Sequence, residues 1–171
     1  MQNLTKVISA DFHRHYQKKI SLVMFFKEYF LNLSFRVVVR YRLQKYMWES
    51  KFRLFKIISV IIRNGNIKKY GVEIGLNSKI GSGIVFHHLN GIVIGDNVVI
   101  GENTNLYQQV TLGLKNGAYP TIGDNVIIYA GAKIVGGVLI GENAVIGANS
   151  FISRNVESNA VAYGFNKIKH S

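Results

Sequence analysis

The sequence of 171 residues contains no cysteine. A disulfide framework, a thiolate metal site and a cysteine nucleophile are therefore all excluded. The absence of cysteine agrees with a reducing compartment, and we expect a cytoplasmic protein.

The chain also lacks the run of roughly 20 uninterrupted apolar residues that crosses a membrane. Its longest apolar stretches, residues 22–39 and 54–62, are broken by charged side chains. The first twenty residues are polar and mixed in charge, unlike a signal peptide. We therefore expect no membrane-spanning segment.

Acidic residues are scarce, with nine Asp and Glu against twenty-one Lys and Arg. Residues 1–70 hold fifteen Lys and Arg against three acids, whereas residues 71–171 hold six of each. The net charge of +12 thus belongs to the first part, which also holds thirteen aromatic residues. We expect a basic α-helical head over residues 1–70 and a second domain over residues 71–171.

Three helices are predicted in the head: residues 4–19, residues 22–33 after a Ser21 cap, and residues 35–63 after a Ser34 cap. Their apolar faces could pack on each other or on the second domain, leaving the Lys and Arg side chains solvated. Alternatively, the basic, aromatic-rich surface could contact anionic lipid at the inner face of the plasma membrane. Nucleic acid is not an expected partner, because no recognised motif accompanies the charge.

Hydrophobic residues recur every six positions between Ile74 and Ile152, and glycine usually follows them. A helix repeats near 3.6 residues and an exposed strand near two, so a period of six predicts a solenoid of short strands. We expect a mainly β fold, a parallel β-helix with three hexads in each coil, inward aliphatic residues and glycine where the corners are crowded. The recurring positions are Ile74, Ile80, Phe86, Ile94, Ile100, Leu106, Leu112, Ile122, Ile128, Ile134, Ile140, Ile146 and Ile152.

The phase of this repeat slips twice. Eight residues instead of six separate Phe86 from Ile94, and ten separate Leu112 from Ile122. We expect residues 114–120 to leave the coil as a loop. Irregular coils carry side chains away from a regular wall, so function is expected at these two slips.

With the hexads and both slips in place, residues 70–169 resemble the left-handed β-helix acyltransferases, in particular their serine acetyltransferase-like branch. The closest stretches are VEIG (72–75), IGSGIVFHH (80–88), GIVIG (91–95), QVTLG (109–113) and YAGAKI (129–134). The resemblance implies left-handed coils, an exception to the usual handedness of parallel crossovers. It also implies transfer of acetyl from acetyl-CoA to a hydroxyl, and a homotrimer with active sites between neighbouring prisms.

Acetyl transfer to a hydroxyl needs a base for the proton and donors for the oxyanion. Imidazole is the obvious base, and only His87 and His88 lie at a slip of the repeat. The family pattern of Asp-His, two further residues and Gly places the base at His88. The family's acidic partner, fifteen positions earlier, falls on Glu73, so the resemblance implies a Glu73–His88 dyad with Glu in place of Asp. The simpler alternatives are a hydrogen-bonded corner histidine and a solvated glutamate.

The resemblance also implies contacts with CoA. The backbone N–H of Leu114 corresponds to the family's oxyanion donor, and the turns at Ala130 and Ala148 correspond to positions along the pantetheine arm. Lys167 lies in a segment that resembles the family's closing segment and could meet a CoA phosphate. The small residues could equally serve only the packing of the β-helix.

The sequence departs from the serine acetyltransferases where they hold the amino-acid substrate. His87 stands where the family has Asp, and Ala118-Tyr119 stand where it has Arg-His. A neutral acceptor suits these residues better: His87, Asn90 and Tyr107 could hold a sugar hydroxyl, with Tyr119 as a stacking surface. We therefore expect an O-acetyltransferase of a bacterial surface polysaccharide, either capsule, lipopolysaccharide or exopolysaccharide.

Three rival functions stay open. The nearest is serine O-acetyltransferase of cysteine biosynthesis. Some left-handed β-helices instead bind zinc through three histidines and hydrate carbon dioxide, but the adjacent His87 and His88 match three spaced ligands poorly, so no metal is expected. The third is a non-catalytic trimeric scaffold.

Overall fold

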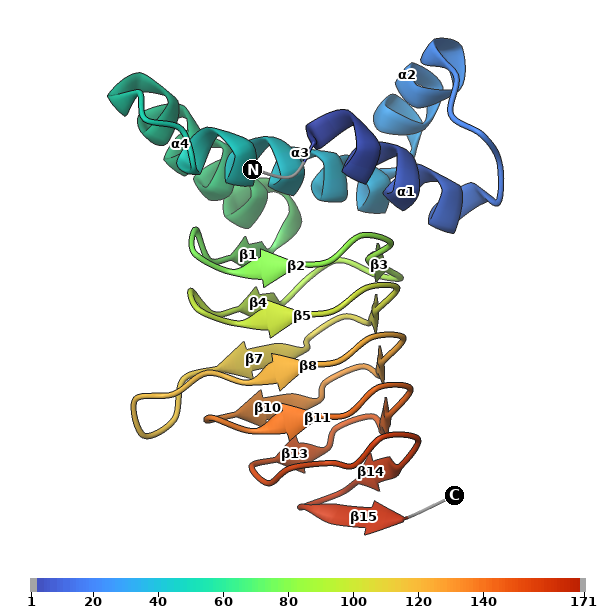
Figure 1. Ribbon diagram of the computed structural model, residues 1–171, viewed down its shortest axis with the longest axis vertical. Helices are drawn as coiled ribbons and strands as arrows, with labels where there is room; N and C mark the ends of the chain where they lie inside the picture. Colours follow the sequence, from blue (N-terminus) through green and yellow to red (C-terminus); the bar gives the residue numbers. More distant parts are fainter. Residues whose placement is uncertain (1–2, 170–171) are drawn as a thin grey trace.

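The computed structural model describes residues 3–169, as a helical head seated on one end of a β-solenoid (Figure 1). The head contains α1 (Leu4–Tyr16), α2 (Leu22–Leu31), α3 (Leu33–Trp48) and α4 (Arg53–Tyr70). Within this described range, none of the helices has both the length and the hydrophobicity needed to cross a bilayer.

One predicted helix cap is confirmed and one is wrong. The Ser21 hydroxyl caps α2 by accepting a hydrogen bond from the Met24 N–H at 3.3 Å. At α3 the cap is Asn32 instead of Ser34, because the Asn32 side chain accepts from the Phe35 N–H at 3.1 Å. Asn and Ser are both good caps, so the choice depends on the chain path between α2 and α3.

The single helix predicted over residues 35–63 is wrong, because the chain forms α3 and α4 with a break at residues 49–52. The two helices pack antiparallel, and the buried Ser59 hydroxyl donates to the Gln44 carbonyl at 2.8 Å. Helix α4 also continues past residue 63, the predicted end of the helix, and includes Gly65. A Cβ on Gly65 would lie 2.6 Å from the Arg40 guanidinium. Gly65 therefore permits a close helix contact, and α4 ends at Gly71 with a positive φ of 63°.

Three sheets of short strands form the solenoid, and each is named here by its first strand. The β1 sheet contains β1 (Val72–Ile74), β4 (Ile92–Ile94), β7 (Thr111–Gly113), β10 (Lys133–Val135) and β13 (Phe151–Ile152). The β2 sheet contains β2 (Lys79–Ile80), β5 (Val99–Ile100), β8 (Thr121–Ile122) and β11 (Leu139–Ile140). The β3 sheet contains β3 (Val85–Phe86), β6 (Asn105–Leu106), β9 (Ile127–Ile128), β12 (Val145–Ile146), β14 (Val161–Tyr163) and β15 (Lys167–Lys169). Paired strands are parallel except for β14 and β15.

The hexad prediction is confirmed, since every one of its inward positions is at most 5% exposed. Successive coils stack in register, so that Ile74 lies opposite Ile94 and Ile80 opposite Ile100. Glycine follows where the next coil approaches closely: a Cβ on Gly75 would lie 2.3 Å from the Asp96 Cα. In Figure 1 the strands of the β2 sheet run from left to right in front and those of the β1 sheet from right to left behind, while the coils descend from the head. This sense of rotation makes the coils left-handed. The predicted fold class is thus confirmed.

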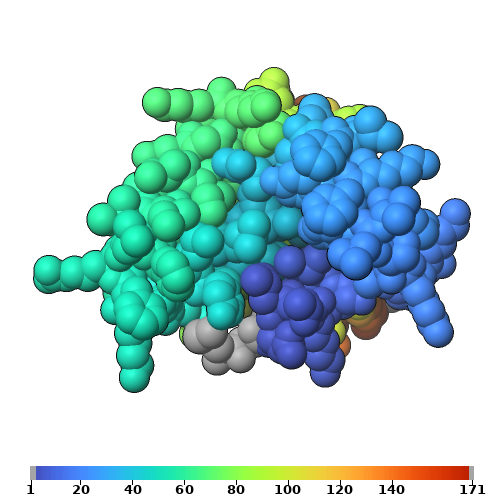
Figure 2. All heavy atoms as spheres, turned by 90° about the horizontal axis from the view of Figure 1, so that it is seen from above, coloured from blue at the N-terminus to red at the C-terminus, as the bar shows by residue number. Residues whose placement is uncertain are grey.

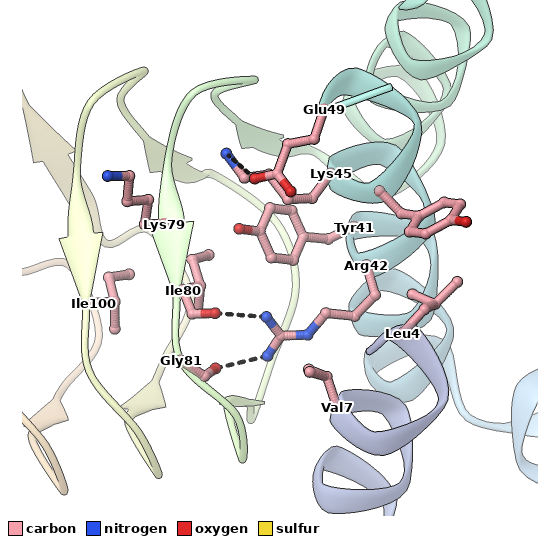
Figure 3. A pocket seen from close by; sticks show the side chains of 11 residues that line it. Leu4, Val7, Tyr41, Arg42, Lys45, Glu49, Lys79, Ile80, Gly81 and Ile100 are labelled. Atoms are coloured by element: carbon pink, nitrogen blue, oxygen red, sulfur yellow. Dashed lines mark hydrogen bonds and ion pairs between the residues drawn. The ribbon is translucent and has the colours of Figure 1, made fainter. Parts of the chain in front are cut away.

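A buried ion pair joins the head to the first coil. Arg42 of α3 and Asp11 of α1 meet at 2.8 Å between Nε and Oδ2, with side chains 5% and 0% exposed. The Arg42 guanidinium also donates to the carbonyls of Ile80 and Gly81 at 2.6 and 2.7 Å (Figure 3). Asp11 accepts from the Gly83 N–H at 2.7 Å. Each charge is therefore both paired and hydrogen-bonded, as burial requires.

Candidate active site

The candidate site lies where the chain turns from the β3 sheet to the β1 sheet. The turns after β3, β6, β9 and β12 stack on one another and form a column along the solenoid axis, called here the corner column. Its backbone is joined by hydrogen bonds from Gln109 N–H to Asn90 O at 3.0 Å, Gly131 N–H to Gln108 O at 2.9 Å and Asn149 N–H to Ala130 O at 2.8 Å. Six predicted site residues belong to this column: His87, His88, Asn90, Tyr107, Ala130 and Ala148.

His88 is exposed, and no residue of the described chain gives it a hydrogen bond or an ion pair. Its turn is fixed from both sides: Leu89 packs against the solenoid core, and the Asn90 N–H donates to the Tyr70 carbonyl at 3.2 Å. The next N–H, from Gly91, donates to the Gly71 carbonyl at 2.8 Å. The two additional residues of the first slip thus form a rigid turn that presents an unpaired imidazole.

Two of the predicted acceptor residues at this corner, His87 and Tyr107, form an aromatic stack with Tyr129. The His87 ring lies 4.3 Å from the Tyr107 ring with 14° between their planes, and Tyr107 lies 5.0 Å from Tyr129. His87 Nε2 is 3.0 Å from the Asn105 side-chain oxygen. Asn90 is exposed and has a φ of 83°. Asn tolerates this left-handed backbone conformation, so Asn90 serves the turn through its backbone.

Glu73 is on β1, and its carboxylate forms an ion pair with Arg63 of α4. No contact within ion-pair distance joins it to His88 in the described chain, so the Glu73–His88 dyad stays a prediction. No sequence pattern indicates the Arg63 pairing, because it depends on α4 continuing to Tyr70 and bringing Arg63 beside the first strand.

Replacing Glu73 and Arg63 one at a time separates the roles of the two residues. We expect Glu73→Gln to lower turnover about tenfold or more, because the imidazolium formed during proton transfer would lose an anionic partner. Arg63→Gln should leave turnover near normal, since it frees Glu73 instead of removing it. Steady-state kinetics of both variants, with the distant Glu102→Gln as control, makes the comparison. Equal turnover in the Glu73 and Arg63 variants would restrict Glu73 to a structural ion pair.

Leu114 and Tyr119 lie at a different corner, in the connection from β7 to β8, where Lys115 and Ala118 form an antiparallel bridge. The Leu114 side chain is exposed, and its N–H donates no hydrogen bond within the described chain. Tyr119 is half-buried, and a Cβ on Gly95 would come within 2.4 Å of its ring. This loop projects from the side of the prism opposite the β3 sheet (Figure 1). One chain therefore does not bring Leu114 or Tyr119 to His88.

Lys167 is exposed on β15, in the antiparallel hairpin that closes the solenoid far from the head (Figure 1). Ala130 and Ala148 lie between it and His88 along the corner column, and Ala148 is exposed. Three of the predicted CoA contacts, Ala130, Ala148 and Lys167, thus follow one another along the axis from the His88 turn towards the last coil.

His15 of α1 lies near His87, although the sequence places it in the head and indicates no role for it at this site. Burial lowers the pKa of His15, and the nearby His87 lowers it further. Its Nδ1 lies 2.9 Å from the Asp11 carbonyl, while its buried Nε2 has no partner in the described chain. Among residues 3–169, no three His, Asp or Glu side chains lie together as metal ligands.

A hollow of about 350 Å³ lies elsewhere, between α1, α3 and the first coils (Figure 3). Its polar side chains are largely engaged: Arg42 pairs with Asp11, and Lys45 is 3.4 Å from Glu49. None of the predicted site residues lines it. The corner column is therefore the better candidate for chemistry.

Comparison with known proteins agrees with this architecture. The family described as "Bacterial transferase hexapeptide (six repeats)" matches residues 119–154. A serine acetyltransferase of Buchnera aphidicola is 34% identical over 136 residues, which are 77% of this chain and 48% of that protein. A serine acetyltransferase of Staphylococcus aureus is 43% identical over 98 residues, 55% of this chain and 46% of that protein. The chain spans about half the length of these two relatives.

Solved structures extend the match to the head. A serine acetyltransferase in complex with CoA superposes with a TM-score of 0.83 at 31% identity, covering 97% of this chain and 69% of that one. A soybean serine acetyltransferase complexed with serine gives 0.84 at 28% identity, with coverages of 97% and 69%. The chain belongs to the serine acetyltransferase family of hexapeptide-repeat transferases. These relatives support the serine alternative better than the polysaccharide acceptor expected from the sequence.

Proposed function

We propose that the protein is an acetyl-CoA-dependent O-acetyltransferase in which His88 takes the proton of the acceptor hydroxyl. The observation that carries the proposal is an exposed, unpaired imidazole held by a rigid turn in a chain of this family. As the hydroxyl oxygen bonds to the thioester carbon, its proton passes to the imidazole and the carbonyl oxygen becomes negative. When that intermediate collapses, the thiolate of CoA leaves and recovers the proton from the imidazolium.

Acetyl-CoA would lie along the corner column. Neighbouring strands are about 4.8 Å apart, so the turns of His88 and Ala148, three steps apart, are separated by roughly 14 Å. A thin pantetheine arm could lie against Ala130 and Ala148 with its thioester at His88 and its phosphates towards Lys167. The solved relative in complex with CoA supports this class of co-substrate.

The oxyanion donor would come from a second chain. Leu114 has a free N–H, but it lies at a different corner from His88, so it can serve only the site of a neighbour. Closed cyclic symmetry brings one corner of each protomer to a different corner of the next. We therefore propose a homotrimer in which the loop of residues 114–120 completes the His88 site of the adjacent protomer.

Serine is the acceptor that the relatives favour, including one solved with serine bound. A sugar hydroxyl, such as one of a surface polysaccharide precursor, is a second candidate because of one observation. The stacked rings of His87, Tyr107 and Tyr129 offer an aromatic surface beside His88, and aromatic faces suit sugars better than a small zwitterion.

One assay tests the reaction and the acceptor together. The full chain is incubated with labelled acetyl-CoA and separately with serine, nucleotide sugars and lipid-linked saccharides, and NMR maps the acetyl group in each product. O-acetylserine would support the first acceptor, and an O-acetyl sugar the second. If no hydroxyl compound increases CoA release above hydrolysis, the proposed activity is wrong.

A further inference from the structure

The helices α2 and α4 each present a second apolar face that no part of the described chain covers. On α2, the side chains of Leu22, Val23, Phe26, Phe30 and Leu31 are each more than half exposed. On α4 and its N-cap the same holds for Phe52, Leu54, Ile57 and Ile61. Scattered exposed apolar residues are ordinary, but grouped ones of this size indicate an interaction surface.

These faces follow helical spacing. Leu22, Phe26 and Phe30 recur at every fourth position, and Leu54, Ile57 and Ile61 at intervals of three and four, so each set lies along one side of its helix. Other sides of the two helices already pack on α3: Phe25 of α2 contacts Phe35 of α3. Ser59 of α4 is buried against α3.

Both helices belong to the head, which covers one end of the solenoid. Figure 2 looks onto this end and shows α2 and α4 on either side of α3. In Figure 1, α2 rises above α3, whereas α4 projects from the head at its N-terminal end and leads into β1 at its C-terminal end. Their apolar faces therefore belong to one end of the protein, called here the head face.

Exposed basic side chains also lie on these two helices. Lys27 of α2 and Arg53, Lys56 and Lys68 of α4 are all exposed. None of them has an ion-pair partner in the described chain.

The acids of the head do not offset these charges. Asp11 is buried with Arg42, Glu49 pairs with Lys45, and Glu28 is half-buried. The head face is thus apolar and cationic, without a free exposed carboxylate from the four helices.

We propose that the head face binds an anionic lipid surface. Helices that combine aromatic and aliphatic side chains with Lys and Arg lie in the headgroup region of such membranes. The charge favours lipid over a second copy of the same face, because two cationic faces would repel each other. Since no described helix can span a bilayer, the contact is peripheral.

Vesicle sedimentation with the full chain tests this proposal and needs neither CoA nor an acceptor. We expect at least about tenfold stronger binding to phosphatidylcholine vesicles containing phosphatidylglycerol than to pure phosphatidylcholine, and weaker binding at high salt. The triple variant Leu22→Ser, Phe26→Ser, Phe30→Ser should lose about tenfold or more of this binding. Leu139→Ser, which removes an exposed leucine from the solenoid, should leave it unchanged.

Two results would overturn the proposal. One is equal binding of the wild type to neutral and anionic vesicles, or binding that the triple variant retains. The other is lipid-free association of the chain that rises with concentration and disappears in the triple variant, which would assign the head face to a second copy. Because acetyl transfer is not measured, failure here leaves the proposed enzymatic function untouched.

Discussion

We expect His88→Ala to lower the rate of acetyl transfer by about 10²- to 10⁴-fold, the usual contribution of a positioned general base. The hydroxyl of an alcohol is almost wholly protonated at neutral pH, so its attack on the thioester slows when no group can take the proton. The loss should appear in kcat, because His88 acts on the reacting oxygen. Affinity for CoA, measured by calorimetry, should change little.

Two other histidines serve as controls for this result. His87→Ala should mainly weaken acceptor binding, because the ring stacks on Tyr107 beside the site. His13→Ala, an exposed change in the head, should have almost no effect. Turnover of His88→Ala within a few-fold of wild type would remove His88 from the chemistry.

The second large effect concerns stability. We expect Asp11→Ala to reduce the free energy of unfolding by about 3–5 kcal/mol, because it leaves the buried Arg42 guanidinium without its counter-ion. It also removes the acceptor of the Gly83 N–H. Denaturant titration followed by circular dichroism measures the loss. A cost below about 1 kcal/mol would contradict the role assigned to this pair.

Two further variants sharpen the stability test. Glu49→Ala breaks the exposed pair with Lys45, and we expect a cost of no more than about 0.5 kcal/mol because solvent screens such pairs. The double variant Asp11→Leu, Arg42→Met should recover much of the loss from Asp11→Ala, since it removes both buried charges together. No recovery would mean that the backbone hydrogen bonds of the pair matter more than its charge balance.

The solenoid could be predicted from the sequence because its signal is local and repeated. Each coil places an aliphatic residue such as Ile94 or Ile146 in the same buried position, so one physical requirement appears many times. The slip at residues 87–91 was equally informative, because an insertion into a stacked coil must leave the wall. These features led to His87 and His88 as candidate bases, and the family resemblance selected His88 between them.

The head and the second half of the site could not be predicted in the same way. The break between α3 and α4 depends on antiparallel packing, in which Gly65 fits against Arg40. The pairing of Glu73 with Arg63 depends on where α4 ends. Tyr119 is predicted to contact the acceptor together with His87. In the folded chain, however, Tyr119 lies at the corner between the β1 and β2 sheets and His88 at the corner between the β3 and β1 sheets.

The central claim is that His88 of one protomer and the loop of its neighbour form one active site, and mixed oligomers test it directly. Chains carrying His88→Ala are co-assembled in equal amounts with chains carrying Leu114→Pro, which removes the proposed oxyanion donor, and acetyl transfer is measured. Each mixed trimer would contain one interface with both groups intact, so random mixing should restore about a quarter of wild-type activity. If the mixture stays as inactive as the two parents, the groups do not act across an interface and the account is wrong.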